Sequence, residues 1–179
     1  MTERQILDAG AIERTLKRIA HEILERNPSD ISLGLIGIQT RGVPLAKRLH
    51  RFIQSIEPDR QIKEVGSLDI SFHRDDMGSN LHVPKDTNVP FPVDGQRVIL
   101  IDDVFYTGRT VRAAMNALLD LGRTESIQLA VLVDRGHRQL PIRADYVGKN
   151  IPTSGQEKVY CRLEEYDGHD EVSIKEVSR

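Results

Sequence analysis

The sequence predicts an α/β domain with a mainly parallel central sheet flanked by helices. Several short runs are apolar at nearly every position, as in strands that are buried on both faces of a parallel sheet. Amphipathic segments with the helical period follow these runs, and such alternation produces parallel strands joined by right-handed crossovers. The chain has 179 residues and no repeat or linker divides it, so we expect a single domain over 1–179.

The elements follow from the spacing of apolar residues and from the residues that interrupt it. An apolar stripe from Ile12 to Leu24 predicts the first helix, and a polar stretch containing Pro28 ends it. Pro44 lies in the first turn of the second helix, where proline is tolerated, and Gly122 ends the third. The expected elements are helices over 12–24, 43–56 and 111–121 and strands over 33–38, 62–70, 97–101, 127–133, 144–147 and 158–163, followed by an acidic, polar tail.

Bulk composition excludes several classes of protein. The net charge of −2 does not indicate a nucleic-acid binder, so any such surface has to be local. The single cysteine, Cys161, cannot form an internal disulfide, and it lies in an expected strand where a packing role is favoured. No signal peptide and no membrane-spanning apolar stretch is evident, so we expect a cytoplasmic protein.

The run from Val98 to Thr110, VILIDDVFYTGRT, carries most of the functional information. Two adjacent carboxylates, Asp102 and Asp103, stand where the buried strand should end, and a turn rich in threonine and glycine then enters a helix. Ligands bind beyond the carboxyl ends of parallel strands, and a helix N-terminus favours phosphate. The acids suit ribose hydroxyls or hydrated magnesium. The run therefore predicts a site for a phosphorylated sugar, rather than a strand with two surface acids and an ordinary turn.

A second turn, Thr40-Arg41-Gly42, follows the first expected strand and should lie at the same edge of the sheet. Its glycine lets the backbone approach an anion, and Arg41 can bind a phosphate through two parallel hydrogen bonds. As an isolated triplet it would be an ordinary turn.

These motifs resemble those of type I phosphoribosyltransferases, which bind 5-phosphoribosyl-1-diphosphate (PRPP). The resemblance implies that family's fold, with a small hood contributed by the terminal segments and a flexible lid over about 71–93. It implies Mg²⁺ held mainly by PRPP, with Asp102 and Asp103 as candidate protein ligands, and catalysis by Asp102, Asp103 and Arg41. The implied PRPP and UMP site comprises Thr40, Arg41, Gly42, Asp102, Asp103, Val104, Phe105, Tyr106, Thr107, Gly108, Arg109 and Thr110.

The expected lid is an irregular segment with three prolines and no sustained period. His73, Arg74 and Asp75 stand at its entrance, where closure would exclude water and place positive charge near the leaving pyrophosphate. The alternative is a surface loop without a role.

Nearly the whole chain, from about Ile12 to Glu157, resembles the PyrR family, and the run VDRGHRQLPIRADYVGKNIPTS is its most specific part. The resemblance implies a regulator that binds pyrimidine-operon leader mRNA when UMP is bound, favouring transcription termination. It also implies conversion of uracil and PRPP to UMP and pyrophosphate. Two residues depart from the expected pattern, His73 in place of a tyrosine and Lys17 in place of a threonine.

Two further groups of residues are assigned by position. Asp134, Arg135 and Val147 are expected at the base, and the alternative is that Asp134, Arg135 and Asp145 form a structural ion-pair network. A basic surface on a nearly neutral protein is the local feature that RNA phosphates require, and a homodimer or higher homo-oligomer would repeat it. For the helical residues the alternative is a solvated charged face. The expected RNA-binding residues are Arg14, Lys17, Arg18, His21, Arg138, Arg143 and Lys149.

Two other functions stay open from the residues alone. One is a purine phosphoribosyltransferase of the hypoxanthine type, and the other is an RNA-binding UMP sensor without significant turnover. The intact acid pair and Thr107 and Thr110 argue for nucleotide binding but do not establish turnover.

Overall fold

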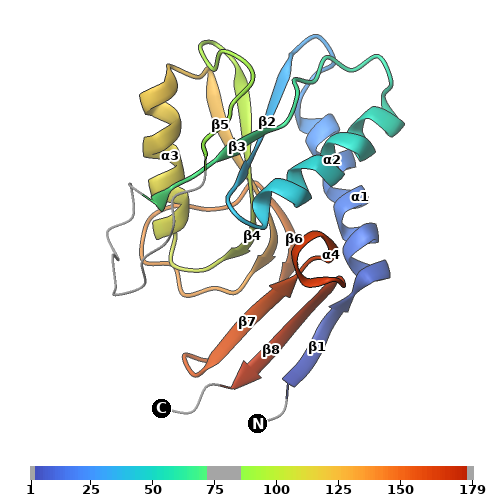
Figure 1. Cartoon of the computed structure of the whole chain (residues 1–179), viewed down its shortest axis with the longest axis vertical. Helices are drawn as coiled ribbons and strands as arrows, with labels where there is room; N and C mark the ends of the chain where they lie inside the picture. The colour runs from blue at the N-terminus through green and yellow to red at the C-terminus, as the bar shows by residue number, and fades with distance from the viewer. Residues whose placement is uncertain (1–2, 72–85, 177–179) are drawn as a thin grey trace.

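The computed structural model describes residues 3–71 and 86–176. Its centre is a parallel five-stranded sheet with the strand order β3-β2-β4-β5-β6, shown in Figure 1. All four neighbouring pairs are parallel, which confirms the predicted fold class. The strands are β2 (Leu33–Ile38), β3 (Gly66–Leu68), β4 (Arg97–Phe105), β5 (Ser126–Asp134) and β6 (Tyr146–Asn150).

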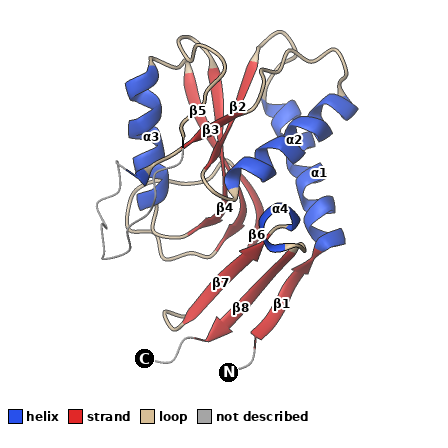
Figure 2. Cartoon of the chain, in the orientation of Figure 1, coloured by secondary structure: helices blue, strands red, loops and turns tan. Residues whose placement is uncertain are grey.

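Helices cover both faces of this sheet. The helices α1 (Ala9–Arg26) and α2 (Gly42–Ile56) pack on one face, while α3 (Arg109–Leu121) covers the other, as Figures 1 and 2 show. Each face has its own apolar cluster: Leu16 and Leu35 belong to the first, and Leu100 and Leu118 to the second. The strand β2 is buried at every position because helices lie on both of its sides. No helix in the described part of the chain is both long and apolar enough to cross a lipid bilayer.

A second, antiparallel sheet is built from the two ends of the chain. It has the order β1-β8-β7 and consists of β1 (Glu3–Asp8), β7 (Glu157–Arg162) and β8 (Glu171–Glu176). We call it the terminal sheet. The short helix α4 (Glu164–Asp167) connects β7 to β8 and lies beside α2 (Figure 1). The predicted hood was assigned to these same terminal segments.

Four elements differ from the sequence-based expectations. The tail that was expected to be acidic and polar forms α4 and β8, because alternation of Val172 and Ile174 with polar residues builds a strand once β1 and β7 supply hydrogen bonds. The segment β1 was not predicted at all. The strand β4 continues to Phe105, since β5 pairs with it as far as Asp134. The acid pair therefore lies within the last residues of the strand β4 and not beyond its end.

Candidate functional site

The two predicted motifs meet at the carboxyl edge of the central sheet. The strands β2 and β4 are hydrogen-bonded neighbours, with Gly37 opposite Ile101. The turn 40–42 follows β2, and a Cβ atom on Gly42 would lie 2.3 Å from the carbonyl oxygen of Ile101. Only a glycine permits this approach, and it brings the turn directly against the strand that carries the acid pair.

The acid pair is held by backbone hydrogen bonds. The amide of Asp103 donates to Oδ1 of Asp102 at 2.9 Å, and the amide of Val104 donates to Oδ1 of Asp103 at 2.8 Å. Burial raises the pKa of the Asp103 carboxyl, while the Val104 amide, Asp102 and the charge of Arg41 oppose that rise. These contacts hold both carboxylates near the carboxyl end of β4, where ribose hydroxyls or a hydrated cation can bind.

The loop 104–110 encloses a cavity of about 320 Å³. Gly108 adopts a left-handed conformation (φ 93°) as the N-cap residue of α3 and has no side chain to cap the helix, while the Thr107 hydroxyl accepts a long hydrogen bond from the amide of Arg109, at 3.4 Å. The amide groups of the first turn of α3 and the helix dipole therefore favour an anion, as the sequence predicts for a phosphate. The cavity is lined by Asp102, Val104, Phe105, Tyr106, Thr107, Gly108, Arg109, Thr110 and Val111.

Arg41 is already paired with a residue that the sequence did not suggest. Its Nη2 donates to Oδ1 of Asp167 at 2.7 Å, and its Nε donates to Oδ2 at 3.2 Å. Hydrogen bonding to Asp167 raises the pKa of Arg41, and the charge of Asp103 adds to the rise. The two parallel hydrogen bonds that the sequence analysis assigned to a phosphate are thus made to Asp167 of α4. The backbone of the turn 40–42 and the positive charge of the guanidinium remain to attract an anion.

Two of the predicted base residues, Asp134 and Val147, lie on the neighbouring strands β5 and β6. Asp134 is buried at the end of β5 and accepts a hydrogen bond from the Gly136 amide at 2.9 Å. Val147 lies on β6 and is half-buried.

The third predicted base residue, Arg135, is buried and makes its own set of contacts. Its guanidinium stacks 4.0 Å from the centre of the Tyr106 ring, and its Nη2 donates to the carbonyl oxygen of Glu157 at 2.7 Å. Nε donates to the hydroxyl of Thr153 at 3.2 Å. Arg135 thereby ties the loop 104–110 to the segment that enters the terminal sheet.

Several predicted RNA-binding residues gather around β6. Arg138 and Arg143, together with Arg26, line a cavity of about 420 Å³ that Asp134 and Val147 also border. Lys149 is exposed on β6. The structure therefore brings part of the predicted RNA surface next to part of the predicted base site, an arrangement that the sequence did not indicate.

The residues predicted on α1 have different surroundings. Nη2 of Arg18 donates to the carbonyl oxygens of Val147 at 3.1 Å and of Gly148 at 2.5 Å, so it covers the free edge of β6. Lys17 pairs with Glu13 at 2.6 Å and lies over the ring of Phe52, facing α2 instead. His21 and Arg14 are exposed.

Three predicted lid residues, His73, Arg74 and Asp75, lie outside the described residues. Among those described, sequence reasoning missed Asp167 and Thr153. The acids of the tail gave no local sign of their partners, because Asp167 pairs with an arginine 126 positions away in the chain.

The carboxylates of the site can be compared with the ligands that Mg²⁺ requires. In the described part of the chain, no group of three or more histidine, cysteine, aspartate or glutamate side chains can hold a metal ion. Mg²⁺ is commonly bound by one or two carboxylates with the remaining ligands from water and substrate phosphates. The acid pair fits that mode of binding.

A family model for the phosphoribosyl transferase domain matches residues 3–165 of this chain. Solved structures with the same fold include the hypoxanthine phosphoribosyltransferase of Trypanosoma cruzi, with 17% identity, a TM-score of 0.72 and coverage of 98% of this chain and 97% of that one. The enzyme of the same name from Staphylococcus aureus has 20% identity, a TM-score of 0.71 and coverage of 97% and 90%. At such identities the likeness concerns the fold alone.

Curated relatives are much more similar in sequence. The "Bifunctional protein PyrR" of Pelotomaculum thermopropionicum is 57% identical, covering 97% of this chain and 96% of the relative. The protein of the same name from Halalkalibacterium halodurans is 56% identical over 97% of both chains. With a phosphoribosyltransferase fold, an acid pair at the carboxyl edge of the sheet and relatives at this identity over nearly the full length, the chain belongs to the PyrR family of phosphoribosyltransferases.

Proposed function

We propose that the protein converts uracil and PRPP to UMP and pyrophosphate, and that it binds pyrimidine-operon leader mRNA when UMP is bound, favouring transcription termination. The observation that carries the enzymatic part is the cavity of the loop 104–110, with Asp102 in its lining, Asp103 next to it in β4 and the turn 40–42 against the same strand. The membership in the PyrR family supports both parts.

The positions of the loop 104–110, the acid pair and the turn 40–42 suggest which part of PRPP each of them binds. The 5′-phosphate binds in the loop 104–110, on the amides of the first turn of α3 and the hydroxyls of Thr107 and Thr110. The ribose hydroxyls bind to Asp102 and Asp103. The pyrophosphate then reaches the turn 40–42, whose backbone lies against β4.

The reaction is a substitution at C1 of the ribose. The bond between uracil N1 and C1 forms, the bond from C1 to the pyrophosphate oxygen breaks with its electrons going to pyrophosphate, and the N1 proton passes to water. Positive charge develops on the ribose in the transition state, so carboxylates at the ribose stabilise it and the fixed geometry removes much of the entropic cost. Asp102 and Asp103, together with PRPP, would hold Mg²⁺, which would stabilise the charge on the leaving pyrophosphate.

Asp134 and Val147 are the candidates to contact uracil: Asp134 ends β5 opposite Phe105, which lines the cavity of the loop 104–110, and Val147 borders the same neighbouring cavity as Asp134. Arg135 supports the site by a different route. Because its guanidinium stacks on Tyr106 and is hydrogen-bonded to Thr153 and Glu157, it holds the loop in place.

The RNA surface is proposed around Arg138, Arg143 and Lys149, with His21 and Arg14 on the neighbouring helix. Asp134 and Val147 border the same cavity as Arg138 and Arg143. A nucleotide at the base site would therefore lie close to the RNA surface, which gives UMP a direct route to affect RNA affinity. We infer that a two-fold dimer repeats this surface, and light scattering of the protein in solution would measure its mass.

Two measurements on one preparation test this proposal. PRPP is incubated with uracil, cytosine or hypoxanthine, and binding of a pyrimidine-operon leader RNA is measured with and without UMP. We expect nucleotide formation from uracil and tighter RNA binding with UMP. Turnover of hypoxanthine in place of uracil would contradict the assigned base, while RNA binding that ignores UMP would contradict the regulatory part.

A further inference from the structure

The pair formed by Arg41 and Asp167 joins the turn 40–42 to the helix α4, which connects two strands of the terminal sheet. Asp167 binds two nitrogens of the guanidinium, at 2.7 and 3.2 Å. Its Oδ2 also accepts the amide of Leu163 at 2.8 Å. Arg41 and the Leu163 amide together hold the pKa of Asp167 below its usual value. The carboxylate is thus fully ordered by donors from both elements.

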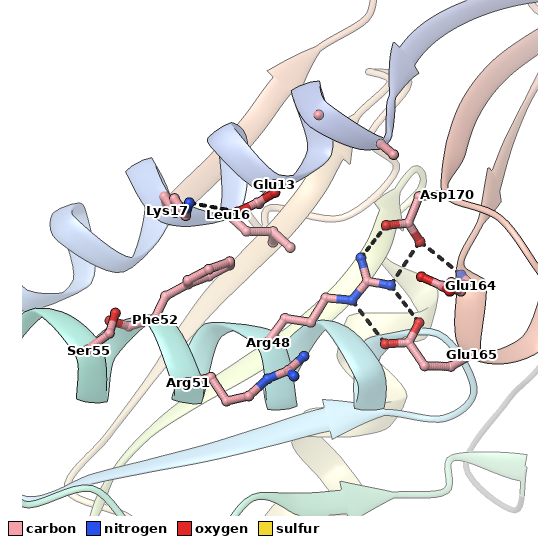
Figure 3. A pocket seen from close by; sticks show the side chains of 12 residues that line it. Glu13, Leu16, Lys17, Arg48, Arg51, Phe52, Ser55, Glu164, Glu165 and Asp170 are labelled. Atoms are coloured by element: carbon pink, nitrogen blue, oxygen red, sulfur yellow. Dashed lines mark hydrogen bonds and ion pairs between the residues drawn. The ribbon is translucent and has the colours of Figure 1, made fainter.

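A second arginine of α2 fixes the position of α4. Arg48 is largely buried and binds Glu165 through Nε at 2.9 Å and Nη2 at 2.6 Å. It also binds Asp170 through Nη1 at 2.6 Å and Nη2 at 2.8 Å. Figure 3 shows both carboxylates converging on this guanidinium, at one end of a groove between α1 and α2. Arg48 therefore docks α4 on α2 through contacts that are separate from the pair of Asp167 with Arg41.

The pair of Asp167 with Arg41 determines where the positive charge of the Arg41 guanidinium lies. Arg41 precedes Gly42, where an added Cβ atom would lie 2.3 Å from the carbonyl oxygen of Ile101 and 3.4 Å from Cα of Asp102. The turn that carries Arg41 therefore lies directly against the part of β4 that carries the acid pair. Without a partner, a long arginine side chain samples many rotamers and loses this position. Bidentate pairing restricts the guanidinium to one geometry.

We infer that Asp167 is a positioning residue for the pyrophosphate part of the substrate site. By holding Nε and Nη2 of Arg41, it keeps the arginine's charge and the turn 40–42 in place where PRPP presents its pyrophosphate. The inference rests on the proposed function, in which this turn receives pyrophosphate. It also assigns the helix α4 a role in substrate affinity.

UMP supplies the discriminating ligand, because it carries the 5′-phosphate and the ribose of the site but no pyrophosphate. We therefore expect Asp167→Asn to weaken PRPP binding about tenfold, as for a charge-assisted contact that has been lost, and to leave UMP binding unchanged. In turnover, KM for PRPP should rise while kcat and KM for uracil change little. Binding is measured by calorimetry on the full chain, so the result does not depend on turnover.

Two further variants separate positioning from loss of structure. Asp170→Asn removes a contact of Arg48 on the same segment and does not touch Arg41, so PRPP binding should stay at the wild-type level. Arg41→Gln should weaken PRPP binding, and adding Asp167→Asn to it should cause no further loss, because Asp167 acts through Arg41.

The outcomes are distinct. Equal weakening of PRPP and UMP in Asp167→Asn, or weakened PRPP binding in Asp170→Asn, would mean that Asp167 only docks α4 and would overturn the inference. Wild-type PRPP affinity in Asp167→Asn would overturn it as well. If the wild-type protein bound neither PRPP nor UMP, the proposed function itself would fail.

Discussion

At the scale of single residues, the acid pair shows how catalysis and stability oppose each other. Burial raises the pKa of Asp103, so the folded protein disfavours its ionised form relative to the unfolded chain. The sign follows from linkage: the folded state binds the proton more tightly, so stability falls as pH rises from the unfolded pKa through the folded pKa. An ionised Asp103 at neutral pH therefore costs stability.

We predict that Asp103→Asn lowers uracil phosphoribosyltransferase activity by about one to two decades, since loss of a charge-assisted hydrogen bond costs roughly 1.5–3 kcal/mol. Because the neutral amide avoids burying a charge, the melting temperature at pH 7 should be unchanged or higher. Steady-state rates and thermal melts would measure both. Asp59→Asn, at an exposed position, is the matched control. Full activity in Asp103→Asn would remove this residue from the reaction.

The hydroxyl of Thr110 permits a second test of the same cavity. Thr110→Val keeps the shape of the side chain and deletes a donor at the start of α3. PRPP and UMP should both bind less tightly, because both carry the 5′-phosphate, and calorimetry with each ligand would measure the change. Thr124→Val, beyond the opposite end of α3, should have no effect. Weaker binding of PRPP alone would place pyrophosphate, and not the 5′-phosphate, in this loop.

At the scale of elements, α4 depends on its contacts with α2. It is only four residues long, and isolated helices of this length do not persist in water. Its ion pairs supply the missing stabilisation, because Arg41 and Arg48 lower the pKa values of Asp167 and Asp170. For a carboxyl group with a lowered pKa, the contribution to stability is present above the unfolded pKa and is lost as pH falls below it.

We therefore predict that acid releases the segment 163–170 before it unfolds the central sheet. The change should start near the unfolded aspartate pKa, about 4, and grow toward lower pH. Hydrogen exchange followed by mass spectrometry, corrected for intrinsic exchange rates, would compare this segment with β4 and β5. Loss of protection at the same pH in both regions would show that α4 is not held by these carboxylates.

At the scale of the whole molecule, a chain of net charge −2 concentrates arginines beside β6. Arg143 is exposed there, and no ion pair involves it in the described part of the chain. Arg18 is a less informative choice for testing RNA contacts, because Nη2 also binds the carbonyl groups of β6. A change at Arg18 therefore mixes effects on RNA with effects on the edge of the sheet.

We predict that Arg143→Gln weakens leader-RNA binding and lowers the slope of log affinity against log salt by roughly one per RNA site, as expected for one phosphate contact. Uracil turnover should be retained. Arg123→Gln, at an exposed site between α3 and β5, is the matched control and should leave the slope unchanged. An unchanged slope in Arg143→Gln would mean that this arginine is only solvated.

Local patterns anticipated most of the central sheet and its three long helices. The apolar run that forms β2 and the helical stripe that forms α1 are buried as predicted, because each pattern is contained in a few adjacent residues. The terminal sheet was missed for the opposite reason. Its strands β1 and β8 pair across more than 160 positions of sequence, so neither one signals its partner.

The sequence by itself determined the parallel α/β fold, and the motifs at Asp102 to Thr110 and at Thr40 to Gly42 indicated where a phosphorylated sugar would bind. These features rest on local periodicity and on the rule that parallel strands present their carboxyl ends at one edge. Only the tertiary structure decided which charges meet: Arg41 with Asp167, Arg18 with the edge of β6, and Arg138 and Arg143 with the cavity beside Asp134. Such pairs join distant segments, and the choice among many carboxylates depends on the packing of α2, α4 and β6 in three dimensions.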